Sequence, residues 1–556
     1  MNRDTVLNAL VDDIFDIVVI GGGATGCGIA LDAASRGLKT ALVEKGDFAS
    51  GTSSKSTKLI HGGLRYLKQF DISLVRESGR ERAVVHRLAP HLSLPEKMLL
   101  PIVKGGSFGK FSTSIGLKVY DLLAGVKGDD RRKMLSRKNT LTEEPLLDPK
   151  GLRGGGLYAE YRTDDARLTI ELIKKACSKG ALALNYAEVK DFIYEKGIVR
   201  GVKAVDTLSG KTIEIKSKKI VSAAGPWVDH LRKINDSINE KRLFLSKGVH
   251  IVVPHARLPI RHSTYFDVPD GRMIFAIPRG KVTYIGTTDT PYEGSLDRIV
   301  ATTADLSYLL KAVNKTFPTS LLTKYDVISN WAGLRPLIHE EGKSPSEMSR
   351  RDEIFVAKDG LISIAGGKLT GYRRMAERIV DKVLGQLKKE NGYSFTKTQT
   401  DQIQLTQKPF SNSAEVEKYI HQVSGKCEAL GLDPYYGWYL VTSYGREAFT
   451  ILDAIDTSQG DIDLALALSE LDYCIDHEMV QRVDDFLVRR TGRLYFDIHS
   501  ISKIKDDVLA TMSERLSWDA DRSAEERKRI DQLVEDATTY YEEEIVDTTE
   551  VLTDKG

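Results

Sequence analysis

Three glycines near the start of the chain have the spacing of a nucleotide-binding turn. Gly21, Gly23 and Gly26 form a GxGxxG motif directly after a β-type run at 15–20 and directly before a helical stretch at 24–35. The first glycine permits a tight turn, the second lets a pyrophosphate approach the backbone, and the third lets the helix pack on the strand. The motif alone is a weak signal, but its position between a strand and a helix predicts a dinucleotide site.

Further features decide which dinucleotide is bound. A second apolar strand at 40–43 ends at Glu44, whose carboxylate can accept hydrogen bonds from a ribose hydroxyl, but this unit suits NAD and FAD alike. Two more glycine turns, IAGGKLTGYRRMA at 364–376 and SAAGPW at 222–227, have no evident use in an NAD enzyme. Beside an isoalloxazine, a helix N-terminus and Lys368 would stabilise the negative charge of reduced flavin. These turns favour FAD.

Composition narrows the class of protein. The 556 residues are too many for one compact core and predict two to four folding units. A formal net charge of +2 provides no global field that would attract nucleic acid. No histidines have the spacing of metal ligands, so no metal is expected. Four distant cysteines without a CxxC pair predict reduced thiols: Cys27, Cys177, Cys427 and Cys474.

The N-terminal run MNRDTVLNALVDDIFD carries acidic residues and lacks the long apolar core and cleavage site of a signal peptide. No later stretch reaches the roughly 18 to 20 uncharged apolar residues of a membrane-spanning helix. We therefore expect a cytoplasmic protein that contacts a membrane only through its surface.

The order of apolar runs predicts a discontinuous fold. Strand-like runs at 220–224 and 361–365 feed glycine turns, so they are expected in the same layer as the first turn. Short β-type runs within 246–340 indicate an inserted antiparallel sheet, and amphipathic patterns beyond about residue 390 indicate helices. The expected fold is α/β and α+β, with a Rossmann-like FAD-binding domain, an antiparallel-sheet substrate domain and a helical C-terminal domain. The predicted boundaries are, respectively, 1–85, 145–245 and 350–390; 86–144 and 246–349; and 391–556.

Several of these runs together resemble one family. The segments IGGGATGCGIALDAASRG and GGKLTGYRRMA look like the two signature segments of FAD-dependent glycerol-3-phosphate dehydrogenases, within the D-amino-acid-oxidase-like flavoproteins. SSKSTKLIHGGLRYL, SKGVHIVVP, IGTTD and AGLRPL resemble the same family in the same order. The similarity covers about the first 390 residues, and the C-terminal part fits more loosely. The chain lacks the insertion of the oxidase branch, which favours the dehydrogenase branch.

The motifs and the resemblance together imply a set of residues that bind FAD. We expect a noncovalent cofactor because no cysteine lies beside the flavin-facing turns, with a histidyl link as the alternative. The predicted residues are Gly21, Gly22, Gly23, Ala24, Thr25, Gly26, Glu44, Ser54, Ser56, His61, Gly62, Gly63, Leu64, Ala224, Gly225, Gly367, Lys368, Leu369 and Thr370.

The family resemblance implies a phosphorylated alcohol as substrate. Its phosphate is a dianion near neutral pH, so the binding pocket requires several convergent cations. The resemblance makes Arg65, Arg335, Arg351 and Lys368 the candidates, with Tyr66 as a hydrogen-bond donor, although any one arginine could be an ordinary surface charge.

Oxidation of the alcohol also requires a base for the hydroxyl proton. His250 is the best candidate because imidazole titrates near working pH, and the alternative is a buried structural histidine. Arg335 is expected to stabilise the alkoxide, and Lys368 to act beside the flavin. His61 is a weaker candidate, since its glycine neighbours fit a close approach to FAD.

The dehydrogenase branch implies glycerol 3-phosphate as substrate and membrane quinone as acceptor. The segment 104–133 mixes phenylalanines and leucines with lysines and arginines, as in surfaces that lie on anionic headgroups; the alternative is an ordinary helix packed on the substrate domain. Peripheral attachment to the inner face of the cell membrane is expected, and the sequence leaves a homodimer open. Rival functions are a glycerol-3-phosphate oxidase that reduces oxygen to peroxide, an amino-acid or hydroxy-acid oxidase on the same scaffold, and a binding module without catalysis.

Overall fold

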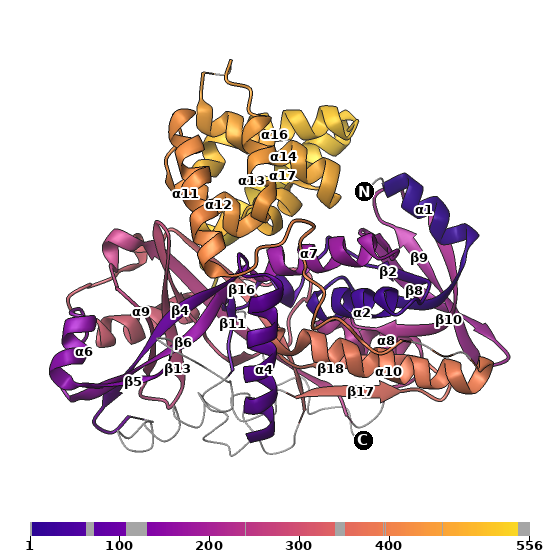
Figure 1. Ribbon diagram of the computed structural model, residues 1–556, viewed down its shortest axis with the longest axis horizontal. Helices are drawn as coiled ribbons and strands as arrows, with labels where there is room; N and C mark the ends of the chain where they lie inside the picture. The colour runs from indigo at the N-terminus through magenta and orange to yellow at the C-terminus, as the bar shows by residue number, and fades with distance from the viewer. Residues whose placement is uncertain are drawn as a thin grey trace, which may run out of the picture.

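The computed structural model describes residues 3–62, 72–106, 131–238, 241–339, 351–392, 394, 396–458 and 460–542. These residues form two β-sheets and a group of C-terminal helices (Figure 1). In Figure 1 the helical group, drawn in orange and yellow, lies against one side of the parts that contain the sheets. No helix within the described ranges is long and apolar enough to cross a membrane.

The first sheet is built around β1 (Ile14–Ile20), which pairs in parallel with β2 and with β10. Alternate side chains of β1 enter different cores: Ile17 and Val19 pack with α2, whereas Val18 and Ile20 pack on the opposite face. A nearly continuous apolar run is typical of such a doubly covered strand. The order is β17 (Asp352–Val356), β18 (Ile362–Gly366), β10 (Thr212–Ser222), β1, β2 (Thr40–Val43) and β7 (Leu182–Leu184), with β9 (Ile198–Asp206) on β10 and β8 (Ala187–Glu195) on β9.

Three helices pack together on one face of this sheet: α2 (Ala24–Ser35), α7 (Asp165–Ser178) and α10 (Tyr372–Asn391). α2 and α10 approach closely at Gly28, where a β-carbon would stand 3.0 Å from a ring carbon of Tyr372. Parallel pairing of β1, β2, β10 and β18 confirms the prediction that these distant segments lie in one layer. Four other helices are α1 (Arg3–Asp12), α4 (Ile72–Leu88), α6 (Arg137–Glu143) and α8 (Val228–Ile234).

The second sheet is almost entirely antiparallel, as expected for an inserted substrate domain. Its exception is the parallel pair β12 and β4. α9 (Thr303–Thr316) begins with a capping box between Thr302 and Asp305. The order is β15 (Thr290–Pro291), β11 (Leu243–Pro254), β14 (Val282–Gly286), β13 (Met273–Arg279), β12 (Ser263–Asp267), β4 (Ser93–Val103), β6 (Leu152–Thr163) and β3 (Leu59–Ile60), with β16 (Ser329–Ile338) on β11 and β5 (Lys133–Ser136) on β6.

This sheet includes two strands from ranges that the sequence indicated for the cofactor domain. β6 pairs along most of its length with β4, and β3 pairs with β6, so both strands are hydrogen-bonded into the second sheet. The chain therefore passes between the two sheets more often than the predicted boundaries suggest.

The C-terminal helices share a core with the second sheet. The cluster joins Trp331 and Tyr284 to residues such as Phe486 and Tyr495. A π-helical turn, Asp485–Arg490, is buried throughout its six residues. The helices are α11 (Ser413–Ala429), α12 (Tyr435–Tyr444), α13 (Ala448–Asp453), α14 (Ile462–Glu478), α15 (Arg493–Phe496), α16 (Ile498–Arg515) and α17 (Ala520–Thr538).

Candidate active site

The turn between β1 and α2 accepts only glycine at two positions. Gly21 has a φ of +115°, and a β-carbon there would lie 2.5 Å from the Ala223 carbonyl oxygen. A β-carbon on Gly26 would lie 1.9 Å from the Gly21 carbonyl oxygen. Gly23 is the N-cap of α2, where a ligand can approach the helix N-terminus. The local geometry is that of a pyrophosphate-binding turn.

Glu44 holds this turn against the end of β2. Its carboxylate accepts hydrogen bonds from the backbone N–H of Gly22 at 2.6 Å and of Gly46 at 2.8 Å. Burial raises the pKa of Glu44, while the two N–H donors favour the charged form. Glu44 also lines the adjoining cavity, where a ribose hydroxyl could reach it.

A cavity of about 580 Å³ runs along the glycine turn. Eleven of the predicted cofactor residues line it: Gly21, Gly23, Ala24, Thr25, Glu44, Ser56, Ala224, Gly225, Gly367, Lys368 and Leu369. The predicted residues Gly22, Gly26, Ser54, His61, Gly62 and Thr370 lie outside the lining, in or beside the same turns. Gly63 and Leu64 lie outside the described residues, as do Arg65 and Tyr66 of the predicted substrate site.

The turn after β18 forms another wall of the cavity. Gly366 and Gly367 have φ values of +77° and +81°, which permit the chain to reverse before Lys368. Thr370 ties this turn to the loop after β3: its hydroxyl accepts from the His61 N–H and donates to the His61 carbonyl, both at 3.1 Å. This contact joins two segments that the sequence assigned to the flavin site separately.

Arg335 on β16 lies across Gly248 of the neighbouring strand β11. A β-carbon on Gly248 would be 2.2 Å from Nη2 of the guanidinium, so the guanidinium could not keep this position opposite any other residue. Arg335 donates to the Thr287 hydroxyl at 2.8 Å and to the Thr288 carbonyl at 3.2 Å, and it pairs with Asp289 at 3.4 Å. The guanidinium is held in a defined orientation.

His250 is buried in the same sheet. Its ring stacks on Trp331 with centroids 4.6 Å apart, and its Nε2 lies 3.0 Å from the Thr57 hydroxyl. Burial, reinforced by the positive charges of Arg335 and Lys58, holds the pKa of His250 well below its ordinary value of 6.5. The imidazole is therefore neutral near neutral pH, which is the form that can accept a proton.

The cavity reaches this strand pair only through Pro336, the residue after Arg335. Neither His250 nor Arg335 lines the cavity itself. Arg351 is exposed and donates to the Ser73 hydroxyl of α4 at 2.8 Å. The catalytic and substrate-binding roles of these residues stay predictions.

Sequence reasoning missed several residues of the cavity wall. Asp165, at the start of α7, lines the cavity and forms a fully buried ion pair with Lys58 at 2.5 Å. Lys45 pairs with Asp297 at 2.6 Å and lies 4.3 Å from the Trp227 ring centre. Lys45 directly follows Glu44 and could have been inferred from that position, whereas Asp165 and Asp297 carry no local signal. Among the described residues, no three His, Cys, Asp or Glu side chains gather as metal ligands.

Comparison with known proteins agrees with this geometry. Residues 16–373 match the family model of FAD-dependent oxidoreductases, and residues 374–523 match the model of the C-terminal domain of alpha-glycerophosphate oxidase. The aerobic glycerol-3-phosphate dehydrogenase of Bacillus subtilis is 48% identical over 98% of this chain and 99% of its own. Its namesake from Staphylococcus aureus (strain USA300) is 48% identical over 96% of this chain and 97% of its own.

Solved structures show the same relationship. The glycerol-3-phosphate dehydrogenase of Bacillus halodurans, complexed with FAD, has a TM-score of 0.82 and 43% identity, covering 97% of this chain and 98% of that one. The L-alpha-glycerophosphate oxidase of Mycoplasma pneumoniae shares the fold, with a TM-score of 0.55 and 20% identity, covering 72% of this chain and 100% of that one. The present chain belongs to the FAD-dependent oxidoreductases, in the family of the aerobic glycerol-3-phosphate dehydrogenases, and its cofactor is FAD.

Proposed function

We propose that this protein oxidises sn-glycerol 3-phosphate to dihydroxyacetone phosphate and passes the electrons to a membrane quinone. The observation that carries the proposal is one cavity lined by both the dinucleotide turn and Lys368 and reaching Pro336, the residue after Arg335. The relatives named aerobic glycerol-3-phosphate dehydrogenase support the same substrate at 48% identity.

Bound FAD supplies a hydride acceptor at N5. In the proposed reaction the substrate loses a hydride from C2 and a proton from the hydroxyl on that carbon. Arg335, oriented by Thr287 and Asp289, stabilises the negative charge that develops on the oxygen. His250 receives the proton in its neutral form. The Thr57 hydroxyl lies 3.0 Å from Nε2 of His250. The proton therefore reaches Nε2 either through this hydroxyl or directly, after the Thr57 side chain has moved away on substrate binding.

The phosphate group needs additional cations. Lys368, at the cavity wall, Arg351 and Arg65 are proposed for this role, with Tyr66 as an uncharged hydrogen-bond donor; Arg65 and Tyr66 lie outside the described residues. A dianion held by several cations separates this substrate from a carboxylate, which needs fewer of them.

The proposed acceptor is quinone because the chain is far more similar to the dehydrogenases than to the oxidase. Attachment to the cytoplasmic face of the membrane is assigned to segment 104–133, of which 107–130 lies outside the described residues. Binding to anionic vesicles, and its loss when Phe108, Phe111, Lys110 and Lys118 are replaced together, tests this part.

Anaerobic mixing of the yellow holoenzyme with substrate tests the reaction. Glycerol 3-phosphate should bleach the flavin, whereas glycerol and lactate at the same concentration should not. Bleaching by lactate or an amino acid instead would refute the substrate assignment. Reoxidation by a soluble quinone without peroxide supports the dehydrogenase, and rapid stoichiometric peroxide formation in air would favour the oxidase.

A further inference from the structure

The loop after β2 connects the cofactor site to the C-terminal domain. Glu44, at the start of loop 44–50, holds the glycine turn through its carboxylate. The Ala49 N–H donates to the Gly22 carbonyl at 3.0 Å, so the far end of the loop is bonded to the same turn. The chain then continues into residues 50–53, which line the cavity. A displacement of this loop would therefore reach the FAD site directly.

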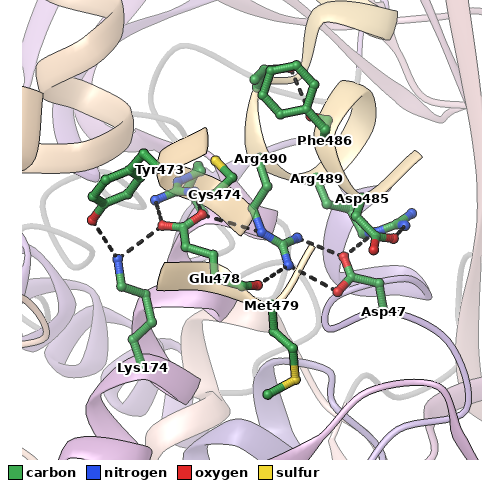
Figure 2. A network of polar contacts seen from close by, with 12 residues as sticks. Asp47, Lys174, Tyr473, Cys474, Glu478, Met479, Asp485, Phe486, Arg489 and Arg490 are labelled. Carbon is green, nitrogen blue, oxygen red and sulfur yellow. Dashed lines mark hydrogen bonds and ion pairs between the residues drawn. The ribbon is translucent and has the colours of Figure 1, made fainter. Parts of the chain in front are cut away.

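Asp47, in the middle of this loop, binds two arginines of the C-terminal domain (Figure 2). Its fully buried carboxylate accepts from Arg490 Nη1 at 2.7 Å and Nη2 at 3.0 Å, and from Arg489 Nε at 2.7 Å. Asn185 donates to Asp47 at 3.2 Å and, from the same nitrogen, to the Met479 carbonyl at 2.9 Å. Burial opposes ionisation, yet Arg490 and Arg489 hold the pKa of Asp47 below its ordinary value.

The two arginines are themselves fixed within the C-terminal domain. Both lie in the π-helical turn Asp485–Arg490. Arg489 also donates to Asp484 at 2.6 Å and to Asp485 at 2.5 Å, and Arg490 donates to the Glu478 carbonyl at 2.7 Å. A movement that separates one partner from such a network leaves a buried charge unpaired, which is energetically costly. We therefore expect Asp47 and the two arginines to keep a fixed geometry.

We propose that Asp47, Arg489 and Arg490 are positioning residues of the cofactor site. Through them the C-terminal domain sets the geometry of the loop that carries Glu44, so its docking and the binding of FAD are coupled. Stabilisation of the domain interface alone would not require contact with this loop. The network nevertheless contacts Asp47, three residues after Glu44, in a loop that is hydrogen-bonded to the glycine turn. The inference concerns FAD and does not depend on the identity of the substrate.

The FAD affinity of holoenzyme variants tests the coupling. In Arg490→Lys the charge remains, but the two-pronged contact with Asp47 is lost. We expect the FAD dissociation constant, measured from flavin fluorescence on dilution, to rise about tenfold or more. Arg489→Lys retains the Arg490 contacts and should shift the constant in the same direction by less. It also serves as the test if Arg490→Lys does not fold.

Arg493→Lys is the matched control. Arg493 pairs with Glu470 at 2.7 Å, both side chains are buried, and the pair lies within the C-terminal domain. This variant should lower the thermal midpoint while leaving the FAD dissociation constant within about twofold of the parent. Equal changes in FAD affinity for the Arg490 and Arg493 variants, or lower thermal stability of the Arg490 variant without a change in affinity, would overturn the inference.

Coupling must also operate in the opposite direction. Hydrogen exchange of residues 478–497 should be slower in the FAD-loaded parent than in the FAD-stripped parent, and this difference should shrink in Arg490→Lys. Equal exchange rates with and without FAD would show that the domain is docked independently of the cofactor, which is contrary to the inference.

Discussion

The cofactor site and the proposed substrate site are built in different ways. The cofactor half is centred on a backbone turn, from Gly21 to Gly26, which is one short stretch of chain. The proposed substrate half relies on long side chains: Arg335 stands opposite Ser246 and His250 opposite Trp331 in the β11–β16 pair, and the guanidinium lies across Gly248, between these two positions. A backbone site is defined by local sequence, whereas a side-chain site depends on the register of two strands.

Glycine has a different purpose in each half. On Gly26, a β-carbon would collide with the backbone of its own turn. On Gly248 and Gly286, a β-carbon would collide with the side chains of Arg335 and His250, respectively. The first kind of glycine shapes the chain for a ligand, and the second kind makes room for the side chains of Arg335 and His250. Substitutions should therefore cause separable defects in cofactor binding and in chemistry.

Gly23→Val should cause the largest effect, the loss of FAD from a folded chain. A β-carbon at Gly23 would have a single close neighbour, the Ser53 hydroxyl at 3.1 Å, so the turn itself can accommodate it. The valine methyl groups would fill the space that the pyrophosphate needs. The flavin absorbance and the circular dichroism of the purified variant measure the two properties. Stoichiometric FAD in this variant would refute the assignment of the turn.

Arg335→Lys should lower the rate of anaerobic flavin reduction by a factor of about 10². Lysine keeps the positive charge but lacks the planar guanidinium, which can donate two parallel hydrogen bonds. The spectrum of bound FAD should not change, since Arg335 does not line the cavity. Stopped-flow measurement at saturating substrate separates the chemical step from binding. Reduction at the parental rate would leave Arg335, at most, as a binding residue.

The contrast between the halves explains how much the sequence could predict. The glycine turn, Glu44 and the parallel strands follow local rules, and eleven of the predicted cofactor residues line the cavity. For His250, the sequence indicated the correct strand but not Thr57 or Trp331, which contact the ring only after the sheet and the loop assemble.

The contacts of the C-terminal domain are harder still to predict. Asp47 and Arg490 are separated by 443 residues, and neither lies in a motif that suggests the other. The pattern of charged amphipathic helices predicted a helical domain but not which of its arginines would be buried. Sequence alone therefore indicates the elements, and the pairing of distant charges requires the structure.

Gly286→Ala should reduce the rate of flavin reduction about tenfold through His250. The added β-carbon would lie 2.0 Å from Cδ2 of His250, which must move away from its stack on Trp331. FAD content should remain at the parental level, because Gly286 lies in the second sheet. Gly385→Ala, in α10 with open space around it, is the control and should change neither property. A parental rate in Gly286→Ala would argue against His250 as the base.

Asp289→Asn should have the smallest effect, a decrease of about threefold in kcat/KM. Asp289 pairs with Arg335 at 3.4 Å, but the guanidinium keeps its bonds to the Thr287 hydroxyl and the Thr288 carbonyl. A hydrogen bond to a charged group contributes about 1.5 to 3 kcal/mol, but this contact is long and asparagine keeps an oxygen there, so only a small part of that stabilisation should be lost. Steady-state assays over a range of glycerol 3-phosphate concentrations measure the effect, and Arg335→Lys is the reference variant, in which the guanidinium is absent. If Asp289→Asn were as slow as Arg335→Lys, orientation by Asp289 would be the dominant requirement, and the two threonines would not suffice to hold Arg335 in place.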